Sequence, residues 1–304
     1  MTCLADLRAD MNAFLTNPPP ELDFVLPGLL AGAVGTLIAP GGMGKTMLVT
    51  QLGCELAMGL PLLNGTLAVP VSEPKKVVLF LAEEDMTIMH HRILDIVGVL
   101  LPGLKRMSSK DRSNLRKLLN TNLCLYTLAG HAGLVSLEPG TTIGDDVMAA
   151  CNGARLVVFD PLRRFHKGNE NSPEHMSAVV QQSELVAHKT RAAVLLPHHA
   201  SQHSISTGTG DIVTAGRGTT ALPDGVRMQM NLSPVGRELA KEWDLPDQAL
   251  GQYVQLKGTK ANYAPRADTV VLHRQPNSGV LVPVDYPAAK TTSKAARVKN
   301  GDRT

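Results

Sequence analysis

Short apolar runs alternate with longer amphipathic stretches from residue 34 onward. Continuous apolar runs of this length are typical of parallel strands that helices cover on both faces. They occupy residues 34–39, 77–82, 123–128, 156–159 and 192–196. Helices are expected between them, at residues 45–58, 87–101, 111–120, 145–151 and 173–190. The alternation predicts a doubly wound α/β fold with a mostly parallel, twisted sheet.

The pattern changes after residue 197. Residues 201–214 are mostly Ser, Thr and Gly and contain neither aromatic residues nor Lys or Arg, which predicts a loop. Later apolar runs predict antiparallel strands that extend the sheet, at residues 226–232, 253–257, 269–273 and 280–284.

The same patterns divide the chain into three segments. Residues 1–24 contain Pro18-Pro19-Pro20, which favours extended geometry, and are expected to form an N-terminal arm or linker. Residues 25–284 are expected to form one domain, because α/β folds often use about 200 to 250 residues as a single unit. Residues 285–304 are rich in Ala, Lys and Thr and are expected to be a flexible basic tail.

The composition favours a folded protein without a membrane span. Hydrophobic residues are 43% of the chain and charged residues 19%, so a core can be buried. No stretch approaches the ~18 continuous apolar residues that cross a bilayer. Asp6, Arg8 and Asp10 stand where a secretory signal would be apolar. A cytoplasmic protein is expected, with its four separated cysteines as free thiols.

The positive charge lies at the C-terminal end. The formal charge is +3, and residues 285–304 alone hold five Lys or Arg against two Asp, which is also +3. The body is therefore neutral, and aromatic residues are only 3%, so neither a broad basic surface nor a platform for stacking bases is indicated. Nucleic-acid binding would need a localised basic site, or several subunits around one strand.

The strongest motif is Ala39-Pro-Gly-Gly-Met-Gly-Lys-Thr46, which separates the first predicted strand from the first predicted helix. This context predicts a P-loop, because backbone N–H groups and a helix N-terminus then converge on phosphate oxygens. Lys45 would reach the β- and γ-phosphates of ATP, and Thr46 would offer its hydroxyl to Mg²⁺. The loop around the phosphates would consist of Gly41, Gly42, Met43 and Gly44.

Asp160 ends the apolar run that begins at Leu156, about 115 residues after Lys45. A carboxylate at the C-terminal end of a buried parallel strand is where a Walker-B aspartate holds the Mg²⁺ of a bound nucleotide. The alternative is an Asp that only caps the next turn.

Three carboxylates, Glu83, Glu84 and Asp85, follow the second predicted strand. A glutamate on the strand beside the P-loop strand can orient the water that attacks the γ-phosphate. Glu83 is assigned this catalytic role, with Glu84 as its rival. An acidic cap on the next helix would also explain Glu84 and Asp85.

His198 and His199 close the fifth predicted strand, at the edge where open α/β sheets bind ligands. One of them, assigned as His198, could hydrogen-bond to the γ-phosphate or to Glu83 and so report whether ATP is intact. Histidines that only satisfy buried carbonyls are the alternative. Metal ligation by both is disfavoured, because neighbours on a strand point to opposite faces.

Four basic residues are further candidates. Arg163, Arg164 and Lys167 follow the Asp160 strand at the ligand edge, where they could contact nucleic-acid phosphates or a neighbouring subunit, or be ordinary surface charge. Arg227 has no local explanation. It is reasonable as an arginine finger that points across a subunit interface at the next subunit's γ-phosphate.

These motifs closely resemble those of the small RepA-type hexameric replicative helicases of broad-host-range plasmids, which belong to the RecA-like ATPase group. The likeness runs from about residue 18 to residue 283, nearly the whole chain. It rests on Pro18-Pro-Pro with Leu26-Pro, Pro40-Gly-Gly-Met-Gly-Lys-Thr, Ala82-Glu83, His90-His91-Arg92, Asp160-Pro-Leu-Arg-Arg-Phe-His, His198-His199-Ala-Ser and Lys260-Ala-Asn-Tyr263.

The resemblance implies a RecA-like P-loop ATPase core and a ring of six subunits, with ATP between neighbours and single-stranded DNA in the central channel. It also implies unwinding in the 5′ to 3′ direction, and primase and initiator proteins of the same replicon as partners. Arg92 and the neighbour's Tyr263 would sandwich the adenine. Arg227 would come from the neighbour, and the subunit that holds the nucleotide would contribute Lys45, Thr46, Glu83, Asp160 and His198.

The sequence departs from the family pattern in three places. Glu84 makes the acidic cluster Glu-Glu-Asp, so the choice of water-positioning residue stays open. Residues 201–214 lack the lysine expected just after the histidine pair. The basic tail is longer than the core needs.

Three functions are consistent with these residues. The first is an ATP-driven hexameric DNA helicase. It is favoured because six copies of Arg163, Arg164 and Lys167, which we call the basic loop, would focus positive charge on a strand in one channel. The second is a RecA-like ATPase that loads, recombines or regulates on DNA without unwinding it. The third is a nucleotide-gated binding switch for a partner protein, which would not be an enzyme.

Overall fold

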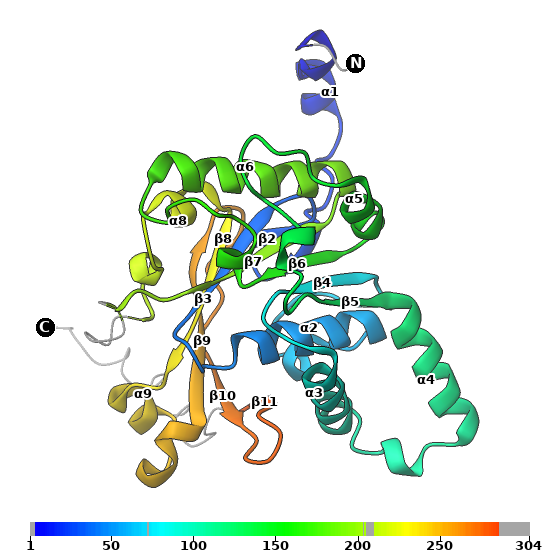
Figure 1. Ribbon diagram of the computed structural model, residues 1–304, viewed down its shortest axis with the longest axis vertical. Coiled ribbons are helices and arrows are strands. Elements are labelled where there is room, and N and C mark those ends of the chain that lie inside the picture. Colours follow the sequence, from blue (N-terminus) through cyan, green and yellow to red (C-terminus); the bar gives the residue numbers. More distant parts are fainter. Residues whose placement is uncertain (1–3, 72, 203, 205–209, 286–304) are drawn as a thin grey trace, which may run out of the picture.

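The computed structural model describes residues 4–71, 73–202, 204 and 210–285. In this part of the chain, helices cover both faces of a nine-stranded sheet with the order β11-β10-β9-β8-β3-β7-β6-β4-β5 (Figure 1). The predicted α/β fold with a mostly parallel sheet is confirmed. Cys3, residues 205–209 and nearly all of the basic tail lie outside the described residues.

The strands from β8 to β5 form the parallel part of the sheet. Their bounds are β3 (Val34–Ala39), β4 (Val77–Leu81), β5 (Leu123–Thr127), β6 (Leu156–Asp160), β7 (Ala193–His199) and β8 (Met228–Pro234). β8 pairs with β9 in antiparallel register, as expected, and it also pairs with β3 in parallel register, where Met228 is opposite Gly35. Consequently β3 and β8 begin at the same end of the parallel strands.

The antiparallel part of the sheet follows β8. It consists of β9 (Tyr253–Ala261), β10 (Val270–Arg274) and β11 (Leu281–Pro283), as expected from the sequence. A separate two-stranded sheet contains β1 (Phe24–Leu26) and β2 (Leu29–Leu30). The chain thus returns through β10 and β11 to lie near the P-loop helix, where Leu281 contacts Gln51.

The helices that pack on the sheet form two layers (Figure 1). One layer contains α2 (Lys45–Met58), α3 (Met86–Leu100) and α4 (Ser109–Asn122). The other contains α5 (Asp145–Cys151), α6 (Pro173–Thr190) and α8 (Ala221–Gly225). The remaining elements are α1 (Met11–Thr16), α9 (Arg237–Glu242) and the 3₁₀ turns η1 (Leu4–Leu7), η2 (Leu62–Gly65), η3 (Leu104–Arg106), η4 (Ala132–Leu134), η5 (Leu162–Arg164), η6 (Val213–Ala215) and η7 (Asp247–Gln252).

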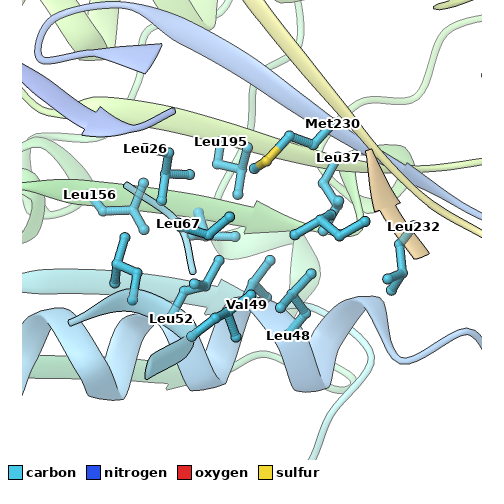
Figure 2. Packing of buried hydrophobic residues seen from close by; sticks show 14 of the residues in the cluster. Leu26, Leu37, Leu48, Val49, Leu52, Leu67, Leu156, Leu195, Met230 and Leu232 are labelled. Carbon is cyan, nitrogen blue, oxygen red and sulfur yellow. The ribbon is translucent and has the colours of Figure 1, made fainter. Parts of the chain in front are cut away.

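The parallel strands β3, β4, β6 and β7 divide their side chains between two cores, because successive residues of a strand point to opposite faces. On β4, Val77, Leu79 and Leu81 pack toward α2, whereas Val78 and Phe80 pack toward α5 and α6. Figure 2 shows the first core, in which the α2 residues Leu48, Val49 and Leu52 meet apolar side chains of the sheet. Burying one such side chain contributes about 1.5 to 3 kcal/mol, so α2 and the loop before it are held firmly against the sheet.

The N-terminal arm contains a short helix that the proline-rich sequence did not predict. Asp10 caps α1 by accepting hydrogen bonds from the N–H groups of Asn12 and Ala13, and α1 projects away from the body (Figure 1). The arm is tied to the body where Asp23 forms a bidentate ion pair with Arg155. Within the described ranges, no helix is both long enough and apolar enough to span a bilayer.

Candidate nucleotide-binding site

The P-loop joins the end of β3 to the start of α2. Gly42 and Gly44 have φ angles of +75° and +94°, a region that favours glycine. No atom lies within 4 Å of a Cβ built on Gly41 or Gly42, so this backbone is open to the cleft beside it. Because the first N–H groups of a helix have no partner within the helix, the N-terminus of α2 favours an anion at this position.

The P-loop forms one wall of a cleft of about 410 Å³. The opposite walls come from the C-terminal ends of β4 and β7, from α3, and from the turn between β10 and β11. Of the residues proposed from the sequence, this cleft brings together Gly42, Gly44, Lys45, Thr46, Glu83 and Arg92. Residues more than 200 positions apart in the chain therefore line one site.

Asp160 lies beneath the P-loop lysine. Its Oδ1 atom is 3.7 Å from Lys45 Nζ, and the side chain is 1% exposed. Neither carboxylate oxygen has a hydrogen-bond partner among the described residues. Burial raises the pKa of Asp160, and the Lys45 ammonium and the Thr46 hydroxyl oppose this rise. A buried carboxylate that forms no hydrogen bond with the described residues, next to a hydroxyl and a phosphate-binding loop, fits Mg²⁺, which usually takes one or two protein ligands together with substrate phosphates.

The two candidate glutamates follow β4, which does not lie beside the P-loop strand as expected, because β7 and β6 separate it from β3. The two carboxylates have different partners. Glu83 Oε1 accepts a hydrogen bond from Arg164 Nε at 2.9 Å, and the Glu83 side chain is 44% exposed. Glu84 Oε1 accepts from Arg92 Nη1 at 2.6 Å, and its side chain is 16% exposed. The capping role belongs to Asp85, whose Oδ1 accepts from the N–H of Ile88 in the first turn of α3. Glu84 therefore holds Arg92, whereas Glu83 has a carboxylate at the mouth of the cleft.

The two histidines at the end of β7 face in opposite directions. His199 lines the cleft, and burial together with the nearby Lys45 ammonium lowers its pKa. His198 is fully buried, and its Nε2 atom donates to the carbonyl of Arg217 at 3.0 Å. His198 is not among the residues that line the cleft, so its side chain matches the alternative of a histidine that satisfies a buried carbonyl. Within the described chain, His199 is the histidine placed for direct contact with a phosphate.

Arg274, at the end of β10, belongs to the site but was missed from the sequence. Its Nη1 and Nη2 atoms donate to the carbonyls of Gly42 and Met43 at 3.0 and 2.8 Å. Ser278 and Gly279, in the turn that follows, also line the cleft. An arginine at the end of a predicted strand carries no signal of a contact with a loop more than 200 residues earlier.

Arg227 and the P-loop of its own chain lie at opposite ends of the parallel strands. Its N–H donates to the carbonyl of Val34, the first residue of β3, whereas the P-loop follows the last residue of β3. The side chain is exposed in a groove of about 550 Å³ between α6 and α8. No ion pair joins Arg227 to another of the described residues.

The remaining candidates lie outside the cleft. Arg163 and Arg164 are in η5, directly after β6, and both are about half-exposed. Lys167 follows in the same loop and is exposed. Tyr263 follows β9 and is 44% exposed. The three basic residues thus lie on the ligand edge of the sheet, and Tyr263 is accessible to another molecule.

The fold and the site together define a P-loop ATPase of the RecA-like type. The ATPase domain of G40P has a similar structure, with a TM-score of 0.53 and 13% identity over 84% of this chain and 86% of that chain. A DnaB-like replicative helicase, solved in a study of its interactions with primase, has a TM-score of 0.56 and 13% identity over 84% and 58% of the two chains. A KaiC-like protein from Pyrococcus horikoshii OT3 has a TM-score of 0.50 and 11% identity over 88% and 100%.

The sequence also matches a known family directly. The model of the AAA domain family matches residues 3–204, which include the P-loop, the acidic cluster, Asp160 and the histidine pair. The chain therefore belongs to this AAA domain family.

Proposed function

We propose that the protein is an ATP-driven DNA helicase that works as a ring of six copies and hydrolyses ATP at the interfaces between them. The ring would enclose single-stranded DNA and move along it in the 5′ to 3′ direction. Membership of an ATPase family, the geometry of the cleft and the fold shared with a DnaB-like helicase support this proposal.

The proposal that two neighbouring copies share each ATP site depends on the position of Arg227. β3 has six residues, and a strand rises about 3.3 Å per residue, so the two ends of β3 are about 20 Å apart. Arg227 therefore cannot reach a triphosphate bound to its own P-loop. An exposed arginine that forms no ion pair with the described residues is available to the triphosphate of a neighbouring copy.

Several residues in and around the cleft have roles in the proposed reaction. Lys45 and the P-loop N–H groups bind the phosphates, and Arg92 lies where a purine could stack on its guanidinium. Thr46 and Asp160 would hold Mg²⁺, which neutralises phosphate charge when it is bound. Glu83 orients the attacking water and accepts its proton. Arg227 of the partner subunit stabilises the charge on the transferred phosphoryl group, and Tyr263 of the partner subunit closes the adenine site.

DNA would bind on the edge of the sheet that carries the ATP cleft. Arg163, Arg164 and Lys167 are at this edge, and Arg164 contacts Glu83 directly. One copy has few positive charges there, so binding to a strand would require assembly. A primase and an initiator of the same replicon are the proposed protein partners, by analogy with the DnaB-like helicase that interacts with primase.

Mixing two inactive variants tests the shared site. Lys45→Ala removes the phosphate-binding lysine, and Arg227→Ala removes the guanidinium without changing the P-loop. Alone, each variant should lose about 10³-fold in kcat, because an arginine finger contributes that factor or more. In mixed rings, a Lys45→Ala copy can supply Arg227 to an intact P-loop of an Arg227→Ala copy, so ATP hydrolysis should reappear. Mixtures that stay inactive, although native mass spectrometry shows mixed rings, would contradict the shared site.

A forked DNA substrate tests unwinding separately from hydrolysis. The proposal expects strand displacement that needs ATP and a single-stranded 5′ tail, and none with a 3′ tail alone. ATP hydrolysis that DNA stimulates, without displacement of either strand, would instead indicate the RecA-like ATPase that loads, recombines or regulates. Hydrolysis that is absent in the presence of DNA and Mg²⁺ would indicate the binding switch.

A further inference from the structure

Glu170 is a buried carboxylate outside the nucleotide cleft, in the loop between β6 and α6. Its side chain is 8% exposed, and Oε1 has no hydrogen-bond partner within the described ranges. Three nitrogen-bearing side chains surround it: Arg163 Nε at 3.9 Å, His198 Nδ1 at 3.8 Å and Arg217 Nε at 3.5 Å. These groups come from the basic loop, from β7, and from residues 210–219, which we call the return segment.

The return segment is attached to the histidine pair through its backbone. The N–H of Arg217 donates to the carbonyl of His199 at 2.8 Å, and the N–H of Ser201 donates to the carbonyl of Ala215 at 2.8 Å. The side chain of His199 lines the nucleotide cleft. A displacement of His199 by a bound triphosphate would therefore pass directly to Arg217.

The backbone of Glu170 also holds the return segment. Its carbonyl accepts a hydrogen bond from the N–H of Thr219 at 3.1 Å. A Cβ at Gly218 would lie 2.3 Å from this carbonyl oxygen, and Gly218 has a φ of +89°. Because only glycine fits such a conformation at such a distance, Glu170 and the return segment meet at a close, fixed junction.

The side chains at this junction are not fully satisfied. The carbonyl of Arg217 can only accept, so His198 Nε2 must carry the proton of a neutral ring, and Nδ1 then has a lone pair. Burial lowers the pKa of His198, which favours the neutral ring. The Nδ1 lone pair and Glu170 Oε1 are therefore two buried acceptors that face each other without a hydrogen bond. Such an arrangement costs free energy unless a neighbouring charge compensates it.

The compensation comes from the two arginines. Arg217 and Arg163 are both at ion-pair distance from Glu170, but neither forms a hydrogen bond with it. The carboxylate thus faces charged partners on two different segments. A buried charge between two segments is suited to link them.

We propose that Glu170 is a positioning residue that couples the nucleotide cleft to DNA binding. When a bound triphosphate displaces His199, the charge of Glu170 makes Arg163 of the basic loop and Arg217 of the return segment move together. The inference rests on the proposed function, because Arg163 is one of its DNA contacts. Without the charge of Glu170, the basic loop and the return segment would move independently of each other.

Glu170→Gln removes the charge and keeps the size and the backbone contact with Thr219. The variant should keep its ATPase kcat without DNA to within twofold, whereas stimulation by an oligo-dT strand should fall at least fivefold. Glu174→Gln is the matched control, because Glu174 lies on the exposed first turn of α6. It should behave like the wild-type protein in both measurements.

Hydrogen exchange gives a second readout that does not depend on DNA. In the wild-type protein, ATPγS should slow exchange at the amides of Arg217 and Thr219, and in Glu170→Gln this change should fall by at least half. Arg217→Met should give the same two effects, and because the Arg217 side chain is 65% exposed this variant should fold even if Glu170→Gln does not.

The outcomes separate the inference from the proposed function. The inference would be overturned if both variants kept the wild-type stimulation of ATP hydrolysis by DNA and the wild-type effect of ATPγS on hydrogen exchange. It would also be overturned if kcat without DNA and kcat with DNA fell by the same factor at an unchanged melting temperature. If the wild-type protein shows no stimulation by DNA, the proposed function fails. The exchange response then still decides whether Glu170 couples the cleft to the return segment.

Discussion

Arg274 Nη2 donates a hydrogen bond to the carbonyl of Met43 at 2.8 Å, and so connects the last strands of the sheet to the P-loop. Nearby, the side chain of Gln51 donates to the carbonyl of Leu281 at 3.0 Å and accepts from its N–H at 3.3 Å. These contacts hold α2 and the P-loop from the side of β10 and β11. Because Arg274 occupies loop carbonyls, it favours a loop whose N–H groups face the cleft.

We expect Arg274→Met to weaken nucleotide binding more than catalysis. The KM for ATP should rise about tenfold, the effect of losing one or two charge-assisted hydrogen bonds of about 1.5 kcal/mol, with kcat within threefold of the wild-type value. Arg274→Lys should be intermediate, because one ammonium group does not match the fork of a guanidinium. Steady-state kinetics and the binding of a fluorescent ATP analogue provide the measurement.

Arg237→Met serves as the control for this prediction, since Arg237 is exposed on α9. An unchanged KM in Arg274→Met would show that the loop keeps its conformation without the arginine.

Glu83 and Glu84 should have separable effects. Glu83→Gln should bind ATP normally and lose at least 100-fold in kcat, the lower end of the range for losing a general base. Glu84→Gln should raise the KM for ATP several-fold and largely keep kcat, because Arg92 loses its 2.6 Å charged partner. Single-turnover hydrolysis and equilibrium binding distinguish the two. The reverse result, with kcat lost only in Glu84→Gln, would assign the water-positioning role to Glu84.

Lys167 provides the clearest test of the basic loop, because Arg163 and Arg164 already contact Glu170 and Glu83. Lys167→Ala should weaken binding of oligo-dT and lower the slope of log K against log salt by about 0.7 per lost phosphate contact. Fluorescence anisotropy over a salt series measures this slope. Lys105→Ala, in η3, should leave it unchanged. Equal slopes in the wild-type protein and in Lys167→Ala would exclude Lys167 from the DNA contact.

Glu55, on α2, makes stability depend on pH. Burial raises its pKa to about 7, and hydrogen bonds with Leu63 and Gln51 oppose the rise. The folded protein therefore keeps a proton that the unfolded chain releases near pH 4.5, so the stabilisation by this proton is complete below pH 4.5 and is lost as the pH rises to 7.

Chemical denaturation at pH 5 and pH 8 tests this dependence. Between these values the free energy of unfolding should fall by about 2 kcal/mol more in the wild-type protein than in Glu55→Gln, which carries no titrating proton there. Glu238→Gln, on the exposed face of α9, should follow the wild-type curve. Identical curves for the wild-type protein and Glu55→Gln would show that Glu55 does not titrate in this range.

Several features of the fold could be predicted from local sequence because local chemistry produces them. The helices at 45–58, 145–151 and 173–190 have the predicted bounds, since a P-loop, an acidic first turn and a Ser-Pro start each fix a helix N-terminus. The buried strands followed from their apolar runs. Lys45, Thr46 and Asp160 meet because β3 and β6 both end at the same edge of a parallel sheet.

The sequence by itself determined the ATPase class, the P-loop and the doubly wound α/β architecture, since each depends on residues close together in the chain. Only the tertiary structure decided that β8 runs parallel to β3, that His199 rather than His198 lines the cleft, and that Arg274 supports the P-loop. The physical reason is that strand order and direction arise from packing between segments far apart in sequence, and they alone decide which edge or face a side chain occupies.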